Sequence, residues 1–211
     1  MKDYLSATDL QNMLLKLYQD IALSENTLTE LDSAIGDGDL GMTLMIGFKE
    51  VDSLLKSHSF HTISELLLAS AEAFSEKAAS TFATLFTIML KAAGKAASEY
   101  SSVGTSQAAA MLEAAVSAVQ KRGKAQLGDK TLLDALIPAA QALKQADREN
   151  LPLSQAAVLS LKEAREGAEK TIAMKARTGR SGYLGDRTIG QKDPGAAAVV
   201  VILESFVSYI V

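Results

Sequence analysis

The stretch LDSAIGDGDLG (residues 31–41) joins two predicted helices and places three carboxylates, Asp32, Asp37 and Asp39, at D-x4-D-x-D spacing. The glycines around the last two reach backbone conformations closed to other residues and let a bulky ligand approach the main chain. Folding alone does not call for several like charges on one tight turn, whereas Mg²⁺ prefers carboxylate oxygens shared with phosphate oxygens and water. The turn favours a metal–nucleotide site, and the alternative is an ordinary solvated turn between helices.

Two better-known motifs fail on this sequence. A calcium-binding EF-hand that starts at Asp37 needs a glycine where the chain has Met42 and a glutamate where it has Phe48. A Walker A phosphate loop would have to use GKAQLGDKT (residues 123–131), where Asp129 interrupts the Gly-Lys step and no strand precedes.

Length and composition predict one ordered globular domain over residues 1–211, because 48% of the residues are hydrophobic and only three are proline. The net charge of −4 gives no electrostatic reason to expect a nucleic acid or an anionic membrane as partner. The chain has no cysteine, its N-terminal segment carries acids unlike a signal peptide, and its most apolar stretch (196–211) contains Glu204 and is too short for a bilayer. We therefore expect a soluble, cytoplasmic protein.

Apolar residues recur at three- and four-residue steps, which predicts an all-α fold of about eight or nine helices. The first helix is expected to begin after Ser6 or Thr8 and to include Leu10 to Ile21, and Asn26 is expected to cap a separate short helix that ends near Ile35. Further helices are predicted over 42–55, 64–76, 83–100, 106–122, 131–147, 154–177 and 195–210, the last with Pro194 in its first turn.

Three connections, 36–41, 122–130 and 178–195, are dense in glycine and charge. Antiparallel helices put alternate loops at the same end of a bundle, so these loops are expected to gather around one site. The longest of them interleaves glycines with arginines and a lysine, which suits an anion such as phosphate, and loops this long in compact domains usually serve function.

Other polar residues give weaker signals. Asp129 or Thr131 heads a predicted helix, where an N-cap role is the favoured interpretation and an anion site the alternative. His58 and His61 are expected to be solvated. Without a catalytic histidine, cysteine or nucleophile motif, covalent catalysis by this chain is not expected and no catalytic side chain is assigned.

Three runs, LDSAIGDGDLG (31–41), KRGKAQLGDKT (121–131) and ARTGRSGYLGDRTIGQKDPGA (176–196), resemble the nucleotide-binding L subunit of the dihydroxyacetone kinases in order and spacing. The resemblance implies an up-and-down antiparallel barrel of about eight helices with the nucleotide at one end. It implies that Asp32, Asp37 and Asp39 hold Mg²⁺ against the phosphates of ADP or ATP, with Gly123 and Leu132 by the adenine and Arg180 by the phosphates. The residues it places at the nucleotide are Leu40, Gly41, Met42, Thr43, Thr81, Phe82, Gly123, Leu132, Arg180, Asp193, Pro194 and Gly195.

The resemblance also implies partners and a reaction. In this family a K subunit holds dihydroxyacetone on a histidine, and the L subunit presents the γ-phosphoryl group of its nucleotide to it. In systems of the phosphotransferase type a third, M subunit recharges the bound nucleotide, whereas other members use free ATP. The chain is therefore expected to be a phosphotransferase (glycerone kinase) subunit that is active only with its partners.

Two departures from the family pattern leave a second interpretation open. The family has a histidine where this chain has Leu40, and a glycine-rich phosphate loop, G-G-[AT]-S-G, where this chain reads Ala-Ser-Thr-Phe-Ala (79–83). Side chains at such positions would crowd a phosphate that approaches the backbone. The first hypothesis is a kinase subunit for dihydroxyacetone or a related small ketose, and the alternative is a catalytically impaired paralogue that acts as a binding or regulatory partner.

Overall fold

The computed structural model describes residues 2–211, and these residues form an all-α protein, as predicted. Two 3-10 segments, η1 (Thr171–Ala173) and η2 (Ser181–Thr188), lie between the last two α-helices. The α-helices are α1 (Ala7–Ile35), α2 (Leu40–Ser57), α3 (Ile63–Lys77), α4 (Thr81–Ala96), α5 (Thr105–Gly123), α6 (Leu133–Arg148), α7 (Leu153–Lys170) and α8 (Pro194–Ile210).

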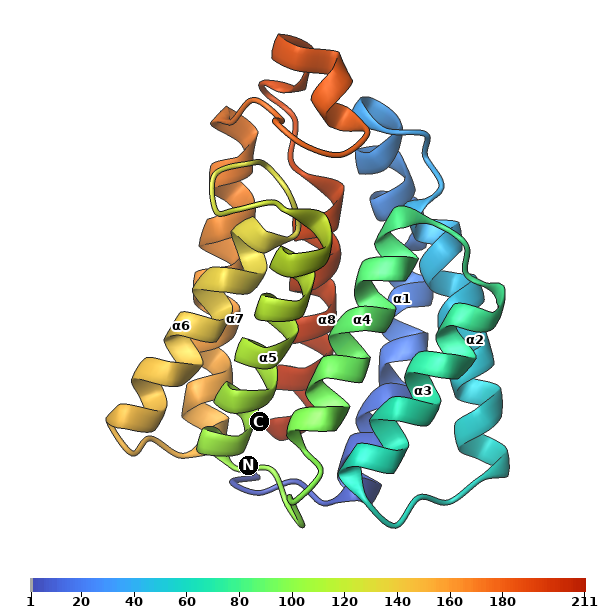
Figure 1. The fold of residues 1–211 in the computed structure, drawn as a ribbon, viewed down its shortest axis with the longest axis vertical. Helices are drawn as coiled ribbons and strands as arrows, with labels where there is room; N and C mark the ends of the chain where they lie inside the picture. Colours follow the sequence, from blue (N-terminus) through green and yellow to red (C-terminus); the bar gives the residue numbers. More distant parts are fainter. Residues whose placement is uncertain (1) are drawn as a thin grey trace.

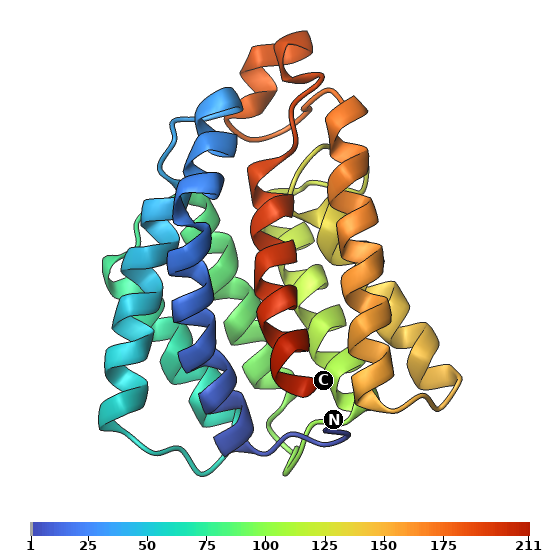
Figure 2. The same ribbon diagram turned by 180° about the vertical axis from the view of Figure 1, so that it is seen from behind.

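The helices run alternately up and down, and each packs against the next along the chain (Figure 1). The ring closes because α8 lies between α7 and α1 and contacts both, as the view from behind shows (Figure 2). The predicted antiparallel barrel of eight helices is thus confirmed.

Side-chain caps explain where several helices begin. Ser6 and Asp9 form a reciprocal capping box at α1, which confirms Ser6 rather than Thr8 as its N-cap. Thr62 and Ser80 cap α3 and α4. Asp193 caps α8, with Pro194 at its first turn as expected.

Two predicted helix ends are wrong. The chain does not break at Asn26, because Ile21 and Leu28 lie seven residues apart on one buried face, and their burial keeps α1 helical through the polar segment between them. Helix α7 ends at Lys170 rather than near Arg177, and the following residues turn through η1 into the long connection.

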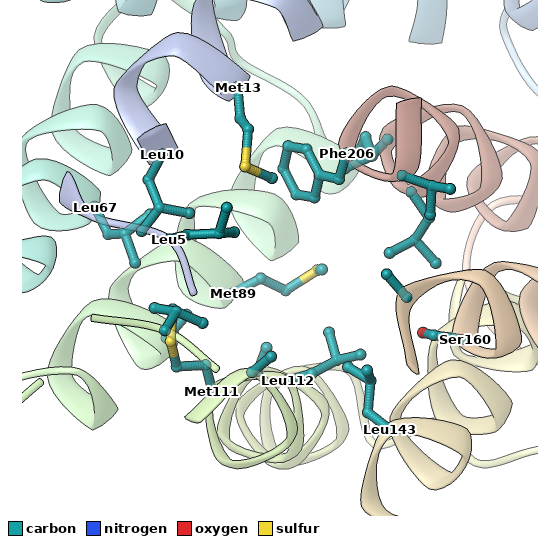
Figure 3. Close-up of a pocket in the computed structure, with 18 of the residues that line it drawn as sticks. Leu5, Leu10, Met13, Leu67, Met89, Met111, Leu112, Leu143, Ser160 and Phe206 are labelled. Atoms are coloured by element: carbon teal, nitrogen blue, oxygen red, sulfur yellow. The ribbon is translucent and has the colours of Figure 1, made fainter. Parts of the chain in front are cut away.

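The barrel interior is apolar. Phe48, Phe74 and Phe86 pack with ring centroids 4.8–5.3 Å apart. Phe86 also lines an apolar pocket of about 210 Å³ (Figure 3). Of the described side chains that line this pocket, only Ser160 is polar, and its hydroxyl donates to the carbonyl of Ala139. A charged phosphate would find no compensating partner there, so the barrel interior does not suit the polar part of a nucleotide.

The two ends of the barrel differ. At one end the N–H of Lys2 donates to the carbonyl of Ile210 (2.9 Å), and Leu5 forms a β-bridge with Val103. The opposite end carries the connections 36–39, 78–80, 124–132 and 171–193 and the N-termini of α2, α4, α6 and α8 (Figure 1). Helix N-termini present free N–H groups and partial positive charge, so this end is suited to an anion. Within residues 2–211, every helix is too short or too polar to span a bilayer.

Candidate functional site

A pocket of about 220 Å³ opens among the four connections at this end, so the glycine-rich loops do gather around one site. The pocket is lined by all three aspartates of the predicted metal site. Of the predicted nucleotide residues, its lining includes Leu40, Thr81, Phe82, Gly123, Leu132, Arg180, Asp193, Pro194 and Gly195.

Three predicted nucleotide residues lie outside this lining, all in the first turn of α2. Gly41 is buried against α1, where an added Cβ would lie 2.3 Å from the carbonyl oxygen of Glu25. Thr43 is buried as well, and Met42 is 59% exposed. The close contact between α1 and α2 therefore requires glycine at position 41.

The aspartate turn is held by one of its own carboxylates. Asp32, near the end of α1, accepts hydrogen bonds from the backbone N–H groups of Asp39 (2.9 Å) and Leu40 (3.2 Å). Gly38 takes the left-handed conformation, with φ 75°, that lets the chain reverse. As a result, one oxygen each of Asp32, Asp37 and Asp39 lies within 4.8 Å of the others.

This convergence of negative charge is electrostatically costly. Partial burial and the neighbouring charge of Asp32 raise the pKa of the Asp39 carboxyl. Asp37 is more exposed and forms an ion pair with Arg180, which comes from the far side of the pocket. Three carboxylates at this separation provide the hard oxygen ligands that a divalent cation prefers, so the donor set fits Mg²⁺.

The segment 79–83 forms a regular helix start. The hydroxyl of Ser80 accepts from the N–H of Ala83 (3.1 Å), and α4 begins at Thr81. Phe82 stacks on Phe86, with ring planes 10° apart and centroids at 6.2 Å, while also lining the pocket. The backbone N–H groups of Thr81 and Phe82 remain without intrahelical partners, as at any helix N-terminus.

The loop 124–132 is organised by Asp134. Its buried carboxylate accepts from the N–H groups of Gly128 (2.6 Å) and Thr131 (2.8 Å). The residue directly before α6 is Leu132, which is already helical and caps nothing, whereas the hydroxyl of Thr131 accepts from the N–H of Leu133 (3.2 Å). Of the two predicted N-caps, Thr131 therefore does cap the first turn, and Asp129 does not, since its carboxylate accepts from the N–H of Gln126 instead. The first-turn residue Asp134 reaches back and satisfies the amides of the preceding loop.

The connection 171–193, which we call the strap, lies at the end of the barrel that carries the site (Figure 1), and its residues 178–181 line the pocket. Its last residue, Asp193, is buried, and its carboxylate accepts from the N–H of Ala196 (2.7 Å). Its own N–H donates to the hydroxyl of Thr171 (2.9 Å), which ties the two ends of the strap together. Burial raises the pKa of Asp193 to about 7, partly offset by the hydrogen bond from Ala196.

Sequence reasoning missed Lys130, whose side chain is only 1% exposed and lines the pocket. Its hydrogen-bond partners are backbone carbonyls more than forty positions away, so no local pattern could reveal it. His58 and His61 lie in the connection between α2 and α3, which is at the end of the barrel opposite the pocket, and both are exposed, as predicted.

Comparison with known proteins identifies the class to which this fold and site belong. Residues 34–208 match the DAK2 domain, and the chain belongs to the DAK2-domain family. Within that family it is similar to the ADP-binding subunit DhaL of the PEP-dependent dihydroxyacetone kinase of Escherichia coli (strain K12), with 31% identity over 95% of each chain. The predicted membership in the L-subunit group of kinase subunits is thereby confirmed.

Larger relatives contain this unit as a part. A probable dihydroxyacetone kinase of Dictyostelium discoideum is 34% identical over 88% of this chain, which spans 30% of that protein. The crystal structure of the dihydroxyacetone kinase of C. freundii superposes with a TM-score of 0.74 at 24% identity, over 94% of this chain and 34% of that one. The same enzyme in complex with AMP-PNP and Mg²⁺ gives a TM-score of 0.70 at 26% identity, over 94% of this chain and 33% of that one.

Proposed function

We propose that this chain is the nucleotide-binding subunit of a kinase for dihydroxyacetone or a related small ketose, and that it binds ADP or ATP together with Mg²⁺. The observation that carries the proposal is the convergence of three carboxylates within 4.8 Å at the barrel end where four helix N-termini meet. Carboxylates and free N–H groups at one site suit a ligand that brings both a cation and an anion, as a metal–nucleotide complex does.

In this proposal Asp32, Asp37 and Asp39 hold Mg²⁺, which when bound neutralises phosphate charge. Arg180 contributes a planar guanidinium that matches phosphate oxygens in pairs. Buried Leu132 and the exposed helix end at Gly123 offer an apolar wall and an open edge for the adenine, with Pro194 and its neighbours at the rim. Because phosphoryl transfer depends mainly on positioning and charge neutralisation, such a site needs no side-chain nucleophile of its own.

The same proposal covers the domain and its partners. Residues 1–211 act as one nucleotide-binding helical domain in the cytoplasm. The acceptor is held on a companion K subunit, and an M subunit is the phosphoryl donor in systems of the phosphotransferase type. The support is that the E. coli relative, which this chain matches over nearly its whole length, is described as a subunit of a PEP-dependent kinase.

The altered segment 79–83 supports a second candidate function, a catalytically impaired paralogue that serves as a binding or regulatory partner. Phe82 places an aromatic ring in the pocket lining where the family resemblance expects a serine. A ring donates no hydrogen bond to phosphate, and together with Leu40 it makes this part of the pocket less polar.

Restoring the glycine-rich loop separates the two functions. Replacing Ala79, Ser80 and Ala83 with glycine and Phe82 with serine should tighten ADP binding and raise turnover with a cognate K subunit, because backbone N–H groups could then close on the phosphates. ADP affinity of the native and restored proteins is compared by calorimetry. Native binding and turnover as good as those of the restored form would remove the impaired-paralogue function.

Arg180 provides a second test of the site. Arg180→Lys keeps the charge but loses the paired N–H geometry, and we expect it to weaken Mg-ADP binding by roughly 1–3 kcal/mol. The matched control is Arg187→Lys, an exposed residue of the same strap to which no ligand role is assigned. Equal losses at both positions would show that the strap arginines have been assigned wrongly.

A further inference from the structure

Lys130 is the only buried cationic side chain in the described part of the molecule. Its ammonium group donates to four backbone carbonyls of the strap, at distances from 2.5 to 3.0 Å. The acceptors are Thr171 (2.8 Å), Met174 (3.0 Å), Thr188 (2.6 Å) and Gln191 (2.5 Å).

These four carbonyls belong to both limbs of the strap. Thr171 and Met174 lie on the limb that leaves α7, and Thr188 and Gln191 lie on the limb that returns to α8. Direct hydrogen bonds between the limbs are few, among them the N–H of Gly190 to the carbonyl of Ile172 (2.8 Å). The ammonium group therefore links the two limbs where they leave the barrel, a part of the strap that we call its base.

The backbone at Lys130 also indicates a specific role. Its φ of 61° lies in the left-handed region, where a residue with a long side chain is strained. That conformation lies within the loop that Asp134 fixes through Thr131 and Gly128. The loop thus holds the side chain directed under the strap.

A buried ammonium group is costly unless its donors are satisfied, and here each of its three N–H groups has a carbonyl acceptor. Burial lowers the pKa of Lys130, and the nearby carboxylate of Asp193 opposes that shift. An apolar side chain of the same length would fill the space but leave the four strap carbonyls without this donor.

The strap that Lys130 closes carries Arg180, which forms the ion pair with Asp37 across the pocket. Arg180 lies at the start of η2, between the two limbs, and η2 contacts α1 beside the aspartate turn. Its position over the site therefore depends on how the base of the strap is fixed.

We propose that Lys130 is a positioning residue: by binding the carbonyls of both limbs, it fixes the strap so that Arg180 reaches the aspartate turn and the phosphates of the bound nucleotide. The role of Lys130 in fixing the strap is inferred from its four hydrogen bonds alone, whereas its effect on nucleotide binding rests on the proposed function.

The test uses Lys130→Met, which keeps the length without the charge, and Lys130→Gln, whose amide still donates two hydrogen bonds. The control is Lys175→Met, because Lys175 is an exposed strap residue that pairs with Asp186 on the surface. Strap order is measured first, without nucleotide, as the rate of trypsin cleavage after Arg177, Arg180 and Arg187, mapped by mass spectrometry. We expect Lys130→Met to raise these rates at least about tenfold, Lys130→Gln to raise them less, and the control to stay near the native rates.

Mg-ADP affinity is then measured for native protein, Lys130→Met, Arg180→Ala and the double variant. A tenfold or greater loss from Lys130→Met that nearly disappears in the Arg180→Ala background would show that Lys130 acts through Arg180. A purely structural role predicts instead an equal fold-loss in both backgrounds and faster cleavage throughout the molecule, and this outcome would overturn the proposal.

Three further outcomes are distinguishable. Native cleavage rates in folded Lys130→Met and Lys130→Gln would overturn the proposal whatever the nucleotide data show. If Lys130→Met does not fold, Lys130→Gln carries both measurements with the same criteria. Absence of Mg-ADP binding by the native chain would instead refute the proposed function, while the cleavage rates would still decide whether Lys130 holds the strap.

Discussion

Replacing Asp37 or Asp39 with alanine should abolish Mg²⁺-dependent nucleotide binding, with a loss of at least about 100-fold in affinity, or ~3 kcal/mol. The physical reason is that a polyphosphate is repelled by the aspartate cluster unless a cation bridges the two. Removing one carboxylate takes a ligand from the cation without removing the remaining negative charge. Calorimetric titration with Mg-ADP measures the loss.

The two variants should keep the fold, because neither side chain belongs to the buried core and the turn is held by Asp32. Asp39→Ala should even retain or gain thermal stability, since its ionised carboxylate is disfavoured by burial and by Asp32. Asp186→Ala is the matched control, because it removes an exposed carboxylate of the strap at the same end of the barrel. Unchanged Mg-ADP affinity in both Asp37→Ala and Asp39→Ala would refute the metal assignment.

The largest expected effect on stability is that of Gly167→Ala in the middle of α7. Alanine in place of glycine inside a helix normally stabilises by roughly 0.5–1 kcal/mol. Here the added Cβ would lie 2.0 Å from the carbonyl oxygen of Asp134 and 3.0 Å from its carbonyl carbon, both backbone atoms of α6. We expect a loss of about 2–4 kcal/mol in unfolding free energy, because backbone cannot move aside as a side chain can.

The close contact has a cause in α6. Pro138 lies four residues after Asp134 and has no N–H, so that carbonyl lacks its usual intrahelical donor and faces α7 instead. Moving it would also disturb the Asp134 carboxylate, which holds the loop next to the site. Chemical denaturation measures the effect, with Gly123→Ala as control, because an added Cβ there meets no atom within 4 Å. A Gly167→Ala protein as stable as the native one would contradict this packing.

Much of the architecture could be predicted from the sequence because apolar periodicity is a local signal. It predicted about eight or nine helices in the right order, and their alternation then placed the glycine-rich connections at one end. The errors occurred where distant packing overrides a local signal. Asn26 is a reasonable helix cap by itself, yet the buried pair Ile21 and Leu28 keeps α1 continuous.

The site was predictable to a different degree in each loop. The aspartate turn is explicit in the sequence, because its three carboxylates lie within eight positions of one another. The role of Lys130 is not, since its four acceptors are backbone atoms that carry no residue signature and lie 41 to 61 positions away. The end of α7 at Lys170 was missed for the same reason. The next residue, Thr171, accepts a hydrogen bond from the N–H of Asp193, at the far end of the strap.

The structure of the segment 79–83 shows how the helix start can form without the glycines of the family pattern. The capping hydroxyl of Ser80 and the stacking of Phe82 on Phe86 give a stable helix start without glycine. Stability of this segment therefore says nothing about its ability to hold phosphate, which depends on the N–H groups left free. That distinction is why affinity, and not folding, must decide between the two candidate functions.

The central claim, that this end of the barrel binds a metal–nucleotide complex, is tested most directly by native mass spectrometry of the intact 22.3 kDa chain with saturating ADP and Mg²⁺. We predict a single added mass of one ADP with Mg²⁺, which disappears when the metal is chelated and in Asp37→Ala but persists in Asp186→Ala. A chain that stays free of nucleotide under these conditions, or binds ADP equally well without Mg²⁺ and in Asp37→Ala, would contradict the account.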